Sequence, residues 1–290
     1  MSRLADRLAV LPQYLLPKQA LTRFAGAAAS HPAGELTTAA IRRFVARYGV
    51  DMSEAADPDI AHYKTFNDFF TRALKPGARP LANAPWVCPV DGAISQFGAI
   101  DHDRIFQAKG HDYTTTALVG GDAALAARFE GGSFATLYLS PRDYHRIHMP
   151  FDGRLQRMIH VPGALFSVNP TTARGVPGLF ARNERVVCVF ESERGPFVLV
   201  LVGATIVGSM ATVWHGVVNP PRPGMLREWT YPEQGQGEVS LARGAEMGRF
   251  LLGSTVVLLF PKDTLRFNPD WQPGRAIRMG EAMGLDAARS

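Results

Sequence analysis

Two histidines three residues apart mark the part of the chain richest in potential chemistry. His145 and His148 lie in YLSPRDYHRIHMPFDG, residues 138–153. A bare H-x-x-H has three interpretations: two hydrogen-bonded structural histidines, part of a metal site, or general acid–base catalysis near neutral pH. Zinc needs at least three protein ligands, and no H-E-x-x-H pattern accompanies this pair. Taken alone, the pattern favours the structural interpretation, although the stretch holds further functional groups: Arg142, Asp143, Tyr144 and Arg146.

A second candidate lies inside the apolar stretch RFLLGSTVVLLF, residues 249–260. The stretch predicts one buried strand covered on both faces, yet Gly253, Ser254 and Thr255 interrupt it. Ser254 lacks the G-x-S-x-G elbow of serine hydrolases, and a serine within a strand is poorly accessible to a substrate. The nearest electrophile is the carbonyl of Gly253, where the absent side chain lets the backbone bend. The strand is therefore predicted to carry its own scissile bond.

Asp91, in PVDGAI at residues 89–94, has two interpretations. Asp-Gly pairs are frequent in turns. A buried Asp can also orient a catalytic histidine and hold its tautomer. The residues alone leave both interpretations open.

The candidates belong to a chain of 290 residues with 46% hydrophobic and 20% charged residues, an ordinary globular composition. Its two cysteines, Cys88 and Cys188, are far apart and have apolar neighbours, which predicts buried free thiols. The N-terminus lacks the apolar core and small-residue cleavage site of a signal peptide. No apolar run reaches the roughly 18 residues of a membrane span.

The pattern changes near residue 80 and predicts an α+β protein. Before KPGARP (75–80), apolar residues recur at helix spacing. After it, short apolar runs alternate with Gly, Pro and Asp turns, which predicts a mostly antiparallel, β-sandwich or barrel-like domain. We therefore expect an N-terminal helical subdomain over residues 1–78 and a β-rich catalytic domain over residues 79–290.

Helix boundaries in the first segment follow from prolines and capping residues. Leucines at helix spacing up to Leu15 predict a helix that Pro12 breaks. Thr37 or Thr38 is expected to cap a later helix. A last helix is expected over residues 65–74, where phenylalanines recur on one face.

The net charge of +5 is confined to the first sixth of the chain, because residues 1–50 hold seven basic and two acidic residues. Either these basic residues are simply solvated on helices that pack on the β domain, or the helices lie on an anionic membrane. Each basic residue near such a surface adds about 1 kcal/mol. Nucleic acid is not expected as a partner, because no basic–aromatic interleaving accompanies the charge.

Many stretches in order carry a resemblance to a known family. Over nearly its whole length the chain resembles the bacterial type of phosphatidylserine decarboxylase proenzymes. The matching stretches are YKTFNDFFTRALKPGARP (63–80), PVDGAISQFG (89–98), QAKGHDY (107–113), YLSPRDYHRIHMPFDG (138–153), PGALFSVNP (162–170), LFARNERVV (179–187), VGATIVGSM (202–210) and EMGRFLLGSTVVLLF (246–260).

The resemblance implies a self-cleaving, pyruvoyl-dependent carboxy-lyase. The family's processing triad falls on Asp91, His148 and Ser254. His148 would take the Ser254 proton while Asp91 orients the imidazole. Cleavage at the Gly253–Ser254 bond would leave a β chain, residues 1–253, and an α chain, 254–290.

The α chain would begin with a covalent pyruvoyl group made from Ser254, and no metal is implied. The amine of phosphatidylserine would form a Schiff base with this group. Loss of CO₂ would then give phosphatidylethanolamine. His145 is the expected proton-handling or carboxylate-contacting residue. Thr255 either assists processing or fills a β position, and Ser167 either lines the substrate pocket or is structural.

Three rival functions stay in view: a pyruvoyl decarboxylase of a soluble amino acid, a metal-dependent hydrolase using His145 and His148, and a non-enzymatic lipid-binding β module. A lipid substrate favours a peripheral enzyme on the cytoplasmic face of the inner cell membrane, docked on anionic lipid by its basic N-terminal helices. The α and β chains are expected to stay associated. A homodimer of processed units is left open.

Overall fold

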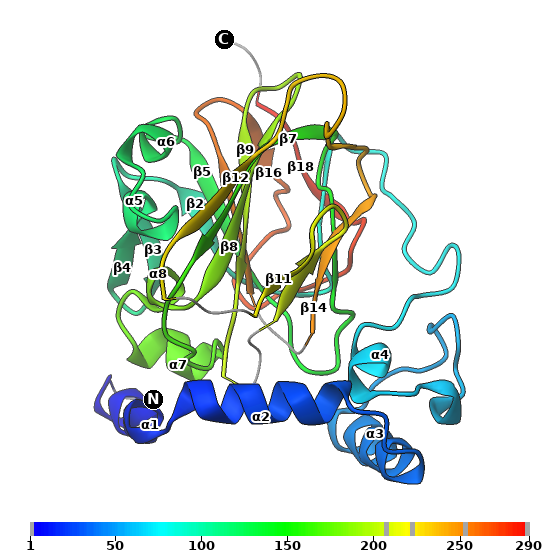
Figure 1. Ribbon diagram of the computed structural model, residues 1–290. Helices are drawn as coiled ribbons and strands as arrows, with labels where there is room; N and C mark the ends of the chain where they lie inside the picture. Colours follow the sequence, from blue (N-terminus) through cyan, green and yellow to red (C-terminus); the bar gives the residue numbers. More distant parts are fainter. Residues whose placement is uncertain (1–2, 206–208, 221–223, 252–254, 288–290) are drawn as a thin grey trace.

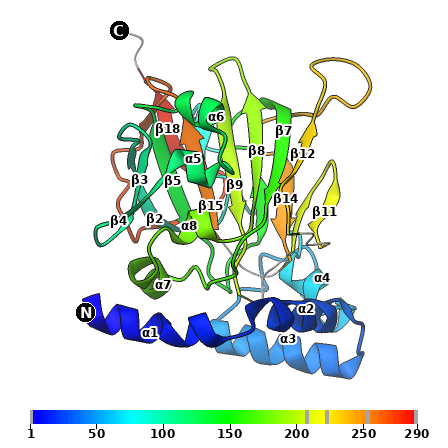
Figure 2. The same cartoon turned by 60° about the vertical axis from the view of Figure 1, so that its left-hand side comes forward.

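The computed structural model describes residues 3–205, 209–220, 224–251 and 255–287. The helices of the first part lie along one end of a β-rich body (Figures 1 and 2). Their bounds are Arg3–Leu15 (α1), Lys18–Ser30 (α2), Glu35–Tyr48 (α3), Ile60–His62 (η1, a 3-10 helix) and Phe66–Phe70 (α4). The predicted α+β class, with helices before strands, is confirmed.

Proline does not end the first helix, so that prediction is wrong. α1 runs through Pro12 to Leu15. The ring removes one backbone donor, but the next turn still forms, because the N–H of Leu16 donates to the carbonyl of Pro12 at 3.2 Å. A single lost bond near a helix end is therefore tolerated here.

The caps of the later helices are partly as predicted. Gly34, in the left-handed region at φ +56°, precedes α3, so the helix begins before Thr37 and Thr38. The hydroxyl of Thr37 instead accepts a hydrogen bond from the N–H of Ala33 at 3.0 Å. Thr65 caps α4 in a reciprocal capping box with Asp68, but this helix ends at Phe70, shorter than the predicted residues 65–74.

The largest described sheet has nine strands, and every pairing in it is antiparallel. The order along the sheet is β12-β7-β8-β9-β15-β5-β2-β17, and β13 also pairs with β7. This open order supports the sandwich description and not a closed barrel. The strands are Gly92–Ala99 (β2), Ser133–Tyr138 (β5), Gly153–Val161 (β7), Arg185–Glu191 (β8), Phe197–Val202 (β9), Arg227–Thr230 (β12), Ser240–Leu241 (β13), Thr255–Phe260 (β15) and Ala276–Ile277 (β17).

Smaller sheets and short helices cover the two faces of this sheet. One small sheet has the order β11-β10-β14-β6, with β11 at Gly216–Asn219, β10 at Met210–Thr212, β14 at Glu246–Phe250 and β6 at Arg146–His148. Another joins Trp86–Val87 (β1), Ala282–Asp286 (β18) and Leu265–Phe267 (β16). The remaining elements are the hairpin Arg104–Ala108 (β3) and His111–Thr114 (β4), and the helices Thr115–Leu118 (α5), Ala123–Ala127 (α6), Pro170–Gly175 (α7) and Leu179–Arg182 (α8).

Strand β15 is buried on both faces, as its continuous apolar sequence predicts. Val256, Leu258 and Phe260 contribute to one hydrophobic cluster, which also contains residues of β6, β10 and β14. Val257 and Leu259 belong to a second cluster with residues of α5, α6 and α8. The large sheet is therefore the middle layer between smaller strands and helices.

The stretch 249–260 is two strands and not one interrupted strand, so the prediction of a single strand is wrong. β14 ends at Phe250 and belongs to the four-stranded sheet, whereas β15 begins at Thr255 in the large sheet. The non-apolar residues fall where the chain passes from one sheet to the other. The predicted cleavage bond, Gly253–Ser254, lies in this link and outside the described residues.

The N-terminal helices are packed onto the β-rich part. Val10 of α1 joins the second hydrophobic cluster. The carboxylate of Asp6 is buried and pairs with Lys109 at 2.6 Å and with Arg174 at 3.3 Å. These contacts cross the predicted boundary at residue 78. The division of the chain into two subdomains at this boundary stays a prediction.

Two further predictions have outcomes in the fold. Cys88 and Cys188 are free and buried, which confirms that prediction. Within the described part of the chain, none of the helices combines the length and the apolar character that a membrane crossing requires.

Gly92 allows a close approach that a side chain would block, and this gives a test of the fold around Asp91. A Cβ at Gly92 would meet the backbone carbonyl of Tyr138 on β5. We expect Gly92→Ala to lower the free energy of unfolding by about 1–3 kcal/mol, the usual cost of overpacking. Denaturant titration would measure this. Gly26→Ala is the matched control, because a Cβ there meets nothing within 4 Å. Equal stability of the two variants would contradict the prediction.

Candidate functional site

His148 lies on β6 with a defined tautomer. Its Nδ1 is 2.8 Å from the carbonyl oxygen of Gly244, and a carbonyl only accepts, so Nδ1 carries the proton. Nε2 is therefore an acceptor, and the hydroxyl of Tyr144 donates to it at 3.1 Å. Burial lowers the pKa of His148, while the hydrogen bond to Gly244 opposes this effect. A neutral imidazole with a basic Nε2 is the state that a general base requires.

Asp91 lies near His148 but is hydrogen bonded to other groups. Its buried carboxylate accepts hydrogen bonds from the Nε and Nη2 of Arg79, at 2.9 Å and 2.6 Å, and from the N–H of Met279 at 2.9 Å. Arg79 also pairs with Glu54 at 2.7 Å. No hydrogen bond joins the Asp91 and His148 side chains in the described structure. The charge of Asp91 still favours protonated His148 and so acts to raise its pKa.

Strand register brings the start of β2 and the start of β15 together. On β5, Tyr138 stands opposite Ala93 of β2 on one side and Thr255 of β15 on the other. Neighbouring strands are about 4.8 Å apart, so Ala93 and Thr255 are about 10 Å apart across the sheet. The segment after Asp91 and the first residue of β15 thus lie at the same end of the large sheet. The backbone N–H of His148 donates to the carbonyl of Pro89 at 2.8 Å, so β6 is bonded to the segment just before Asp91.

His145 is fully buried beside the end of β14. Its backbone carbonyl accepts the N–H of Phe250 at 3.0 Å, and its ring lies 4.0 Å from the ring of Phe70, centre to centre. Nδ1 donates to the carbonyl of Asp143 at 2.7 Å, and Nε2 has no partner among the described residues. Burial lowers the pKa of His145 to about 3; the Asp143 hydrogen bond opposes this effect and the charge of Arg72 adds to it. His145 is therefore neutral near pH 7, with a free acceptor nitrogen.

The other predicted residues have different surroundings. Thr255 is buried at the first position of β15, and its hydroxyl has no partner among the described residues. Ser167 is half-buried in a loop beside α1, where its N–H donates to the side chain of Gln13 at 2.9 Å. Its described contacts link it to the N-terminal helix, while those of Thr255 are with the central strands.

A cavity of about 670 Å³ opens at the sheet edge where Asp91 lies. Its lining includes Asp91, Tyr138 and Tyr144, together with Arg72 and Arg79. Local sequence offers no reason to select Arg79 or the carbonyl of Gly244, because their roles come from long-range contacts. Among these additional site residues, Tyr144 alone has a signal in the sequence, because it lies four residues before His148 in a dense motif.

Metal ligation has little support in the arrangement of side chains. Among the described residues, no group of three or more His, Cys, Asp or Glu is placed to hold a metal ion. His145 and His148 each bind a separate backbone carbonyl through Nδ1. Their geometry is that of two individually oriented imidazoles.

The buried state of His145 predicts a pH dependence of stability. An unfolded histidine titrates near pH 6.5, so between about pH 6.5 and about pH 3 the unfolded chain binds a proton that folded His145 does not. Stability should fall as the pH falls through this window, by at most about 1.4 kcal/mol per pH unit for this group. We expect His145→Gln to flatten the dependence, measured by denaturant unfolding of the Ser254→Ala chain so that cleavage cannot interfere.

His102→Asn is the matched control for this measurement, because the His102 side chain is 84% exposed. The control should keep the slope of the parent chain. An equal slope in His145→Gln and its parent would contradict the neutral, buried state of His145.

Comparisons with known proteins show the family of the chain. The family model described as Phosphatidylserine decarboxylase matches residues 66–285, and one described as PSD matches residues 8–49. A phosphatidylserine decarboxylase proenzyme of Polaromonas naphthalenivorans (strain CJ2) is 79% identical over 287 residues, covering 99% of both chains. The proenzyme of Dechloromonas aromatica (strain RCB) is 75% identical over 284 residues, covering 98% of this chain and 100% of the relative. The chain belongs to the phosphatidylserine decarboxylase family.

Proposed function

We propose that this protein decarboxylates phosphatidylserine to phosphatidylethanolamine and CO₂ after cutting its own chain at Gly253–Ser254. One observation carries the proposal: His145 is bonded to the end of β14, His148 is bonded to the segment before Asp91, and strand register brings that segment level with the start of β15, in a chain that matches decarboxylase proenzymes over its whole length. The name of these relatives supports the substrate and the proenzyme state. The geometry supports His148 as the base, and the bond that would be cut lies in the sequence between β14 and β15.

Self-cleavage needs a base for the Ser254 hydroxyl, and His148 is suited to this role. Its Nε2 is unprotonated and its Nδ1 proton is held by Gly244. The Ser254 oxygen adds to the Gly253 carbonyl, and the peptide nitrogen leaves, so an ester replaces the amide. Elimination of the Gly253 carboxylate and hydrolysis with loss of ammonia then convert Ser254 into a pyruvoyl group. Asp91 stabilises the imidazolium by its charge, because its hydrogen bonds are committed to Arg79 and Met279.

The residues next to the cut fit a pyruvoyl group. When bound to a substrate amine, such a group withdraws electrons and so stabilises the carbanion left by CO₂. The Thr255 hydroxyl is a buried donor without a described partner and directly follows Ser254, so it is placed to hydrogen bond a carbonyl there. The neutral Nε2 of His145 has no partner among the described residues, so it is an acceptor that can take a hydrogen bond from the substrate.

The fold also supports the association of the two chains after cleavage. The α chain would contribute β15, which pairs along its length with β5 and over five residues with β9. Both neighbours belong to the β chain. Their hydrogen bonds and the buried apolar contacts of β15 do not depend on the peptide bond that is cut.

Processing and decarboxylation should separate in the histidine variants. Ser254→Ala and His148→Ala should remain single chains of about 31.6 kDa, because they lose the nucleophile and its base. His145→Ala should still be cut to some extent but should lose decarboxylation. Intact-mass spectrometry under denaturing conditions, with a pyruvoyl-terminated α chain as the expected small product, would measure cleavage. CO₂ release from phosphatidylserine vesicles, with free serine as the comparison substrate, would measure activity.

The control for these variants is His102→Asn, which should be cut and active like the parent. Wild-type activity of His145→Ala would contradict its role. A parent protein that stays uncut near neutral pH would contradict self-cleavage, and release of CO₂ from free serine but not from vesicles would favour a soluble substrate.

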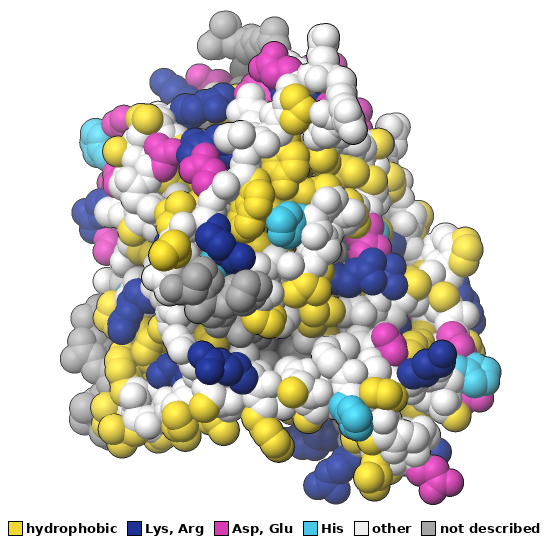
Figure 3. Space-filling model, in the orientation of Figure 1, with side chains coloured by type: hydrophobic (Ala, Val, Ile, Leu, Met, Phe, Trp, Pro, Cys, Tyr) yellow, Lys and Arg dark blue, Asp and Glu magenta, His cyan; other side chains and the backbone are white. Residues whose placement is uncertain are grey.

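Membrane docking through the N-terminal helices is the second part of the proposal. Leu15, Phe24 and Leu36 are 89%, 77% and 76% exposed. Hydrophobic side chains gather along the lower edge of the molecule, beside Lys and Arg (Figure 3). Arg42 and Arg43 of α3 form no ion pair with any described residue. A surface that is both apolar and cationic suits the boundary of an anionic bilayer, and we place the enzyme on the cytoplasmic face of the inner membrane.

The docking proposal predicts salt-sensitive binding to lipid. The protein should sediment with vesicles containing phosphatidylglycerol more than with phosphatidylcholine vesicles, and less as salt rises. Leu15→Ser combined with Phe24→Ser should weaken binding about tenfold or more, since each apolar side chain loses its burial in lipid. The control is Leu285→Ser, which is 47% exposed on β18 at the opposite end (Figure 1). Equal binding of both variants would contradict docking through the helices.

A further inference from the structure

Two cavities lie side by side between α2 and the β-rich part, and one arginine lines both. The outer cavity, about 450 Å³, lies against the first turns of α2 and the segment Ala164–Leu165. The inner cavity, about 380 Å³, reaches Ser209 and Leu251. Arg23 is the residue that the two linings share. Together they form a groove, which we call the α2 groove, and which has Arg23 at its midpoint.

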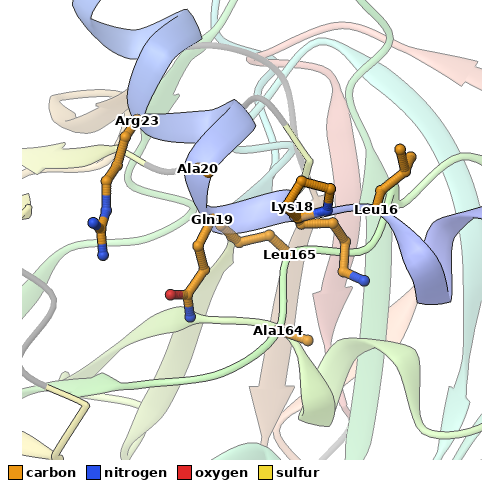
Figure 4. A pocket seen from close by; sticks show the side chains of 8 residues that line it. Leu16, Lys18, Gln19, Ala20, Arg23, Ala164 and Leu165 are labelled. Carbon is orange, nitrogen blue, oxygen red and sulfur yellow. The ribbon is translucent and has the colours of Figure 1, made fainter.

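The charged side chains that line the described part of the α2 groove are all positive. Lys18 and Arg23 are the charged side chains among its described lining residues, and no described Asp or Glu lines either cavity. Arg23 is exposed and forms no ion pair with any described residue. Figure 4 shows the side chains of Gln19 and Arg23 leaving α2 in the same direction, toward the side where Ala164 and Leu165 lie. An unpaired guanidinium in such surroundings is suited to an anionic ligand, above all a phosphate.

Lys18 is engaged elsewhere, which leaves Arg23 as the available cation. The Lys18 ammonium donates to the carbonyl of Gln13 and lies 4.3 Å from the centre of the Phe166 ring. Arg182 stacks over the same ring at 5.1 Å. These cations raise the positive potential at the outer end of the groove, while Arg23 keeps its donors free.

The order of chemical groups along the α2 groove matches the order of groups in a phospholipid. At the outer end lie apolar side chains, among them the exposed Leu16 and the buried Leu165. Arg23 comes next, and the inner end is lined by Leu251, two residues before Gly253. Acyl chains, phosphodiester and serine would meet these three regions in the same order.

We propose that the α2 groove is the phospholipid path to the cleavage site and that Arg23 pairs with the phosphodiester of phosphatidylserine. This inference rests on the proposed function, because it names a subsite for that substrate. Arg23 acts on substrate binding and has no part in self-cleavage. Its loss should therefore raise KM while the chain is still cut.

The test compares Arg23→Gln with Arg266→Gln, an exposed arginine of β16 that has no ion pair with a described residue. Both variants should be processed into two chains. In detergent micelles of phosphatidylserine, Arg23→Gln should raise KM about tenfold or more, Arg23→Lys should raise it less, and Arg266→Gln should leave it unchanged. Binding to phosphatidylglycerol vesicles should fall about equally in Arg23→Gln and Arg43→Gln, so that the loss of vesicle binding can be compared with the change in KM.

Soluble competitors separate a phospholipid subsite from a general phosphate site. Glycerophosphoserine should inhibit the parent enzyme and inhibit Arg23→Gln less. Equal inhibition by inorganic phosphate at matched ionic strength would overturn the assignment to a phospholipid. An unchanged KM in Arg23→Gln, or losses of activity that only follow the losses of vesicle binding, would also overturn it. A processed parent enzyme without activity on phosphatidylserine would instead refute the proposed function.

Discussion

Strand β15 is held by hydrogen-bonded partners on both edges, β9 on one side and β5 on the other. Its side chains enter a different hydrophobic cluster on each face. A residue at the start of such a strand has little freedom, even when the chain before it is cut. Thr255 is therefore held at a fixed point, against which the other residues of the candidate site can be placed.

The two histidines of the candidate site are oriented by backbone carbonyls. His145 donates through Nδ1 to Asp143, and His148 does so to Gly244. Both rings are buried, so both pKa values are lowered, most strongly for His145. The consequence is a pair of neutral imidazoles with unprotonated Nε2 atoms and no need for a carboxylate to select the tautomer. Asp91 is instead fixed by Arg79 and acts on His148 through its charge.

Much of this arrangement was predictable from local sequence, and the remainder depends on contacts distant in the chain. The apolar run of β15 predicted burial on both faces, and the dense motif around His145 predicted its importance. The break between β14 and β15 was misread, because periodicity cannot tell an interrupted strand from two strands in different sheets. The helix-breaking effect of Pro12 is smaller than the sequence suggests, because the loss of one hydrogen bond near a helix end costs little stability. Arg79 and Gly244 could not be selected, because their partners are 12 and 96 residues away.

The apolar and cationic face of the N-terminal helices links adhesion to chemistry. Converting phosphatidylserine into phosphatidylethanolamine removes one negative charge from the bilayer per lipid. If the enzyme docks as proposed, its reaction would weaken the electrostatic attraction that holds it to the bilayer, and its residence time would shorten as local substrate is consumed. The enzyme would then move to regions still rich in anionic lipid, so that membrane charge would regulate where the reaction proceeds.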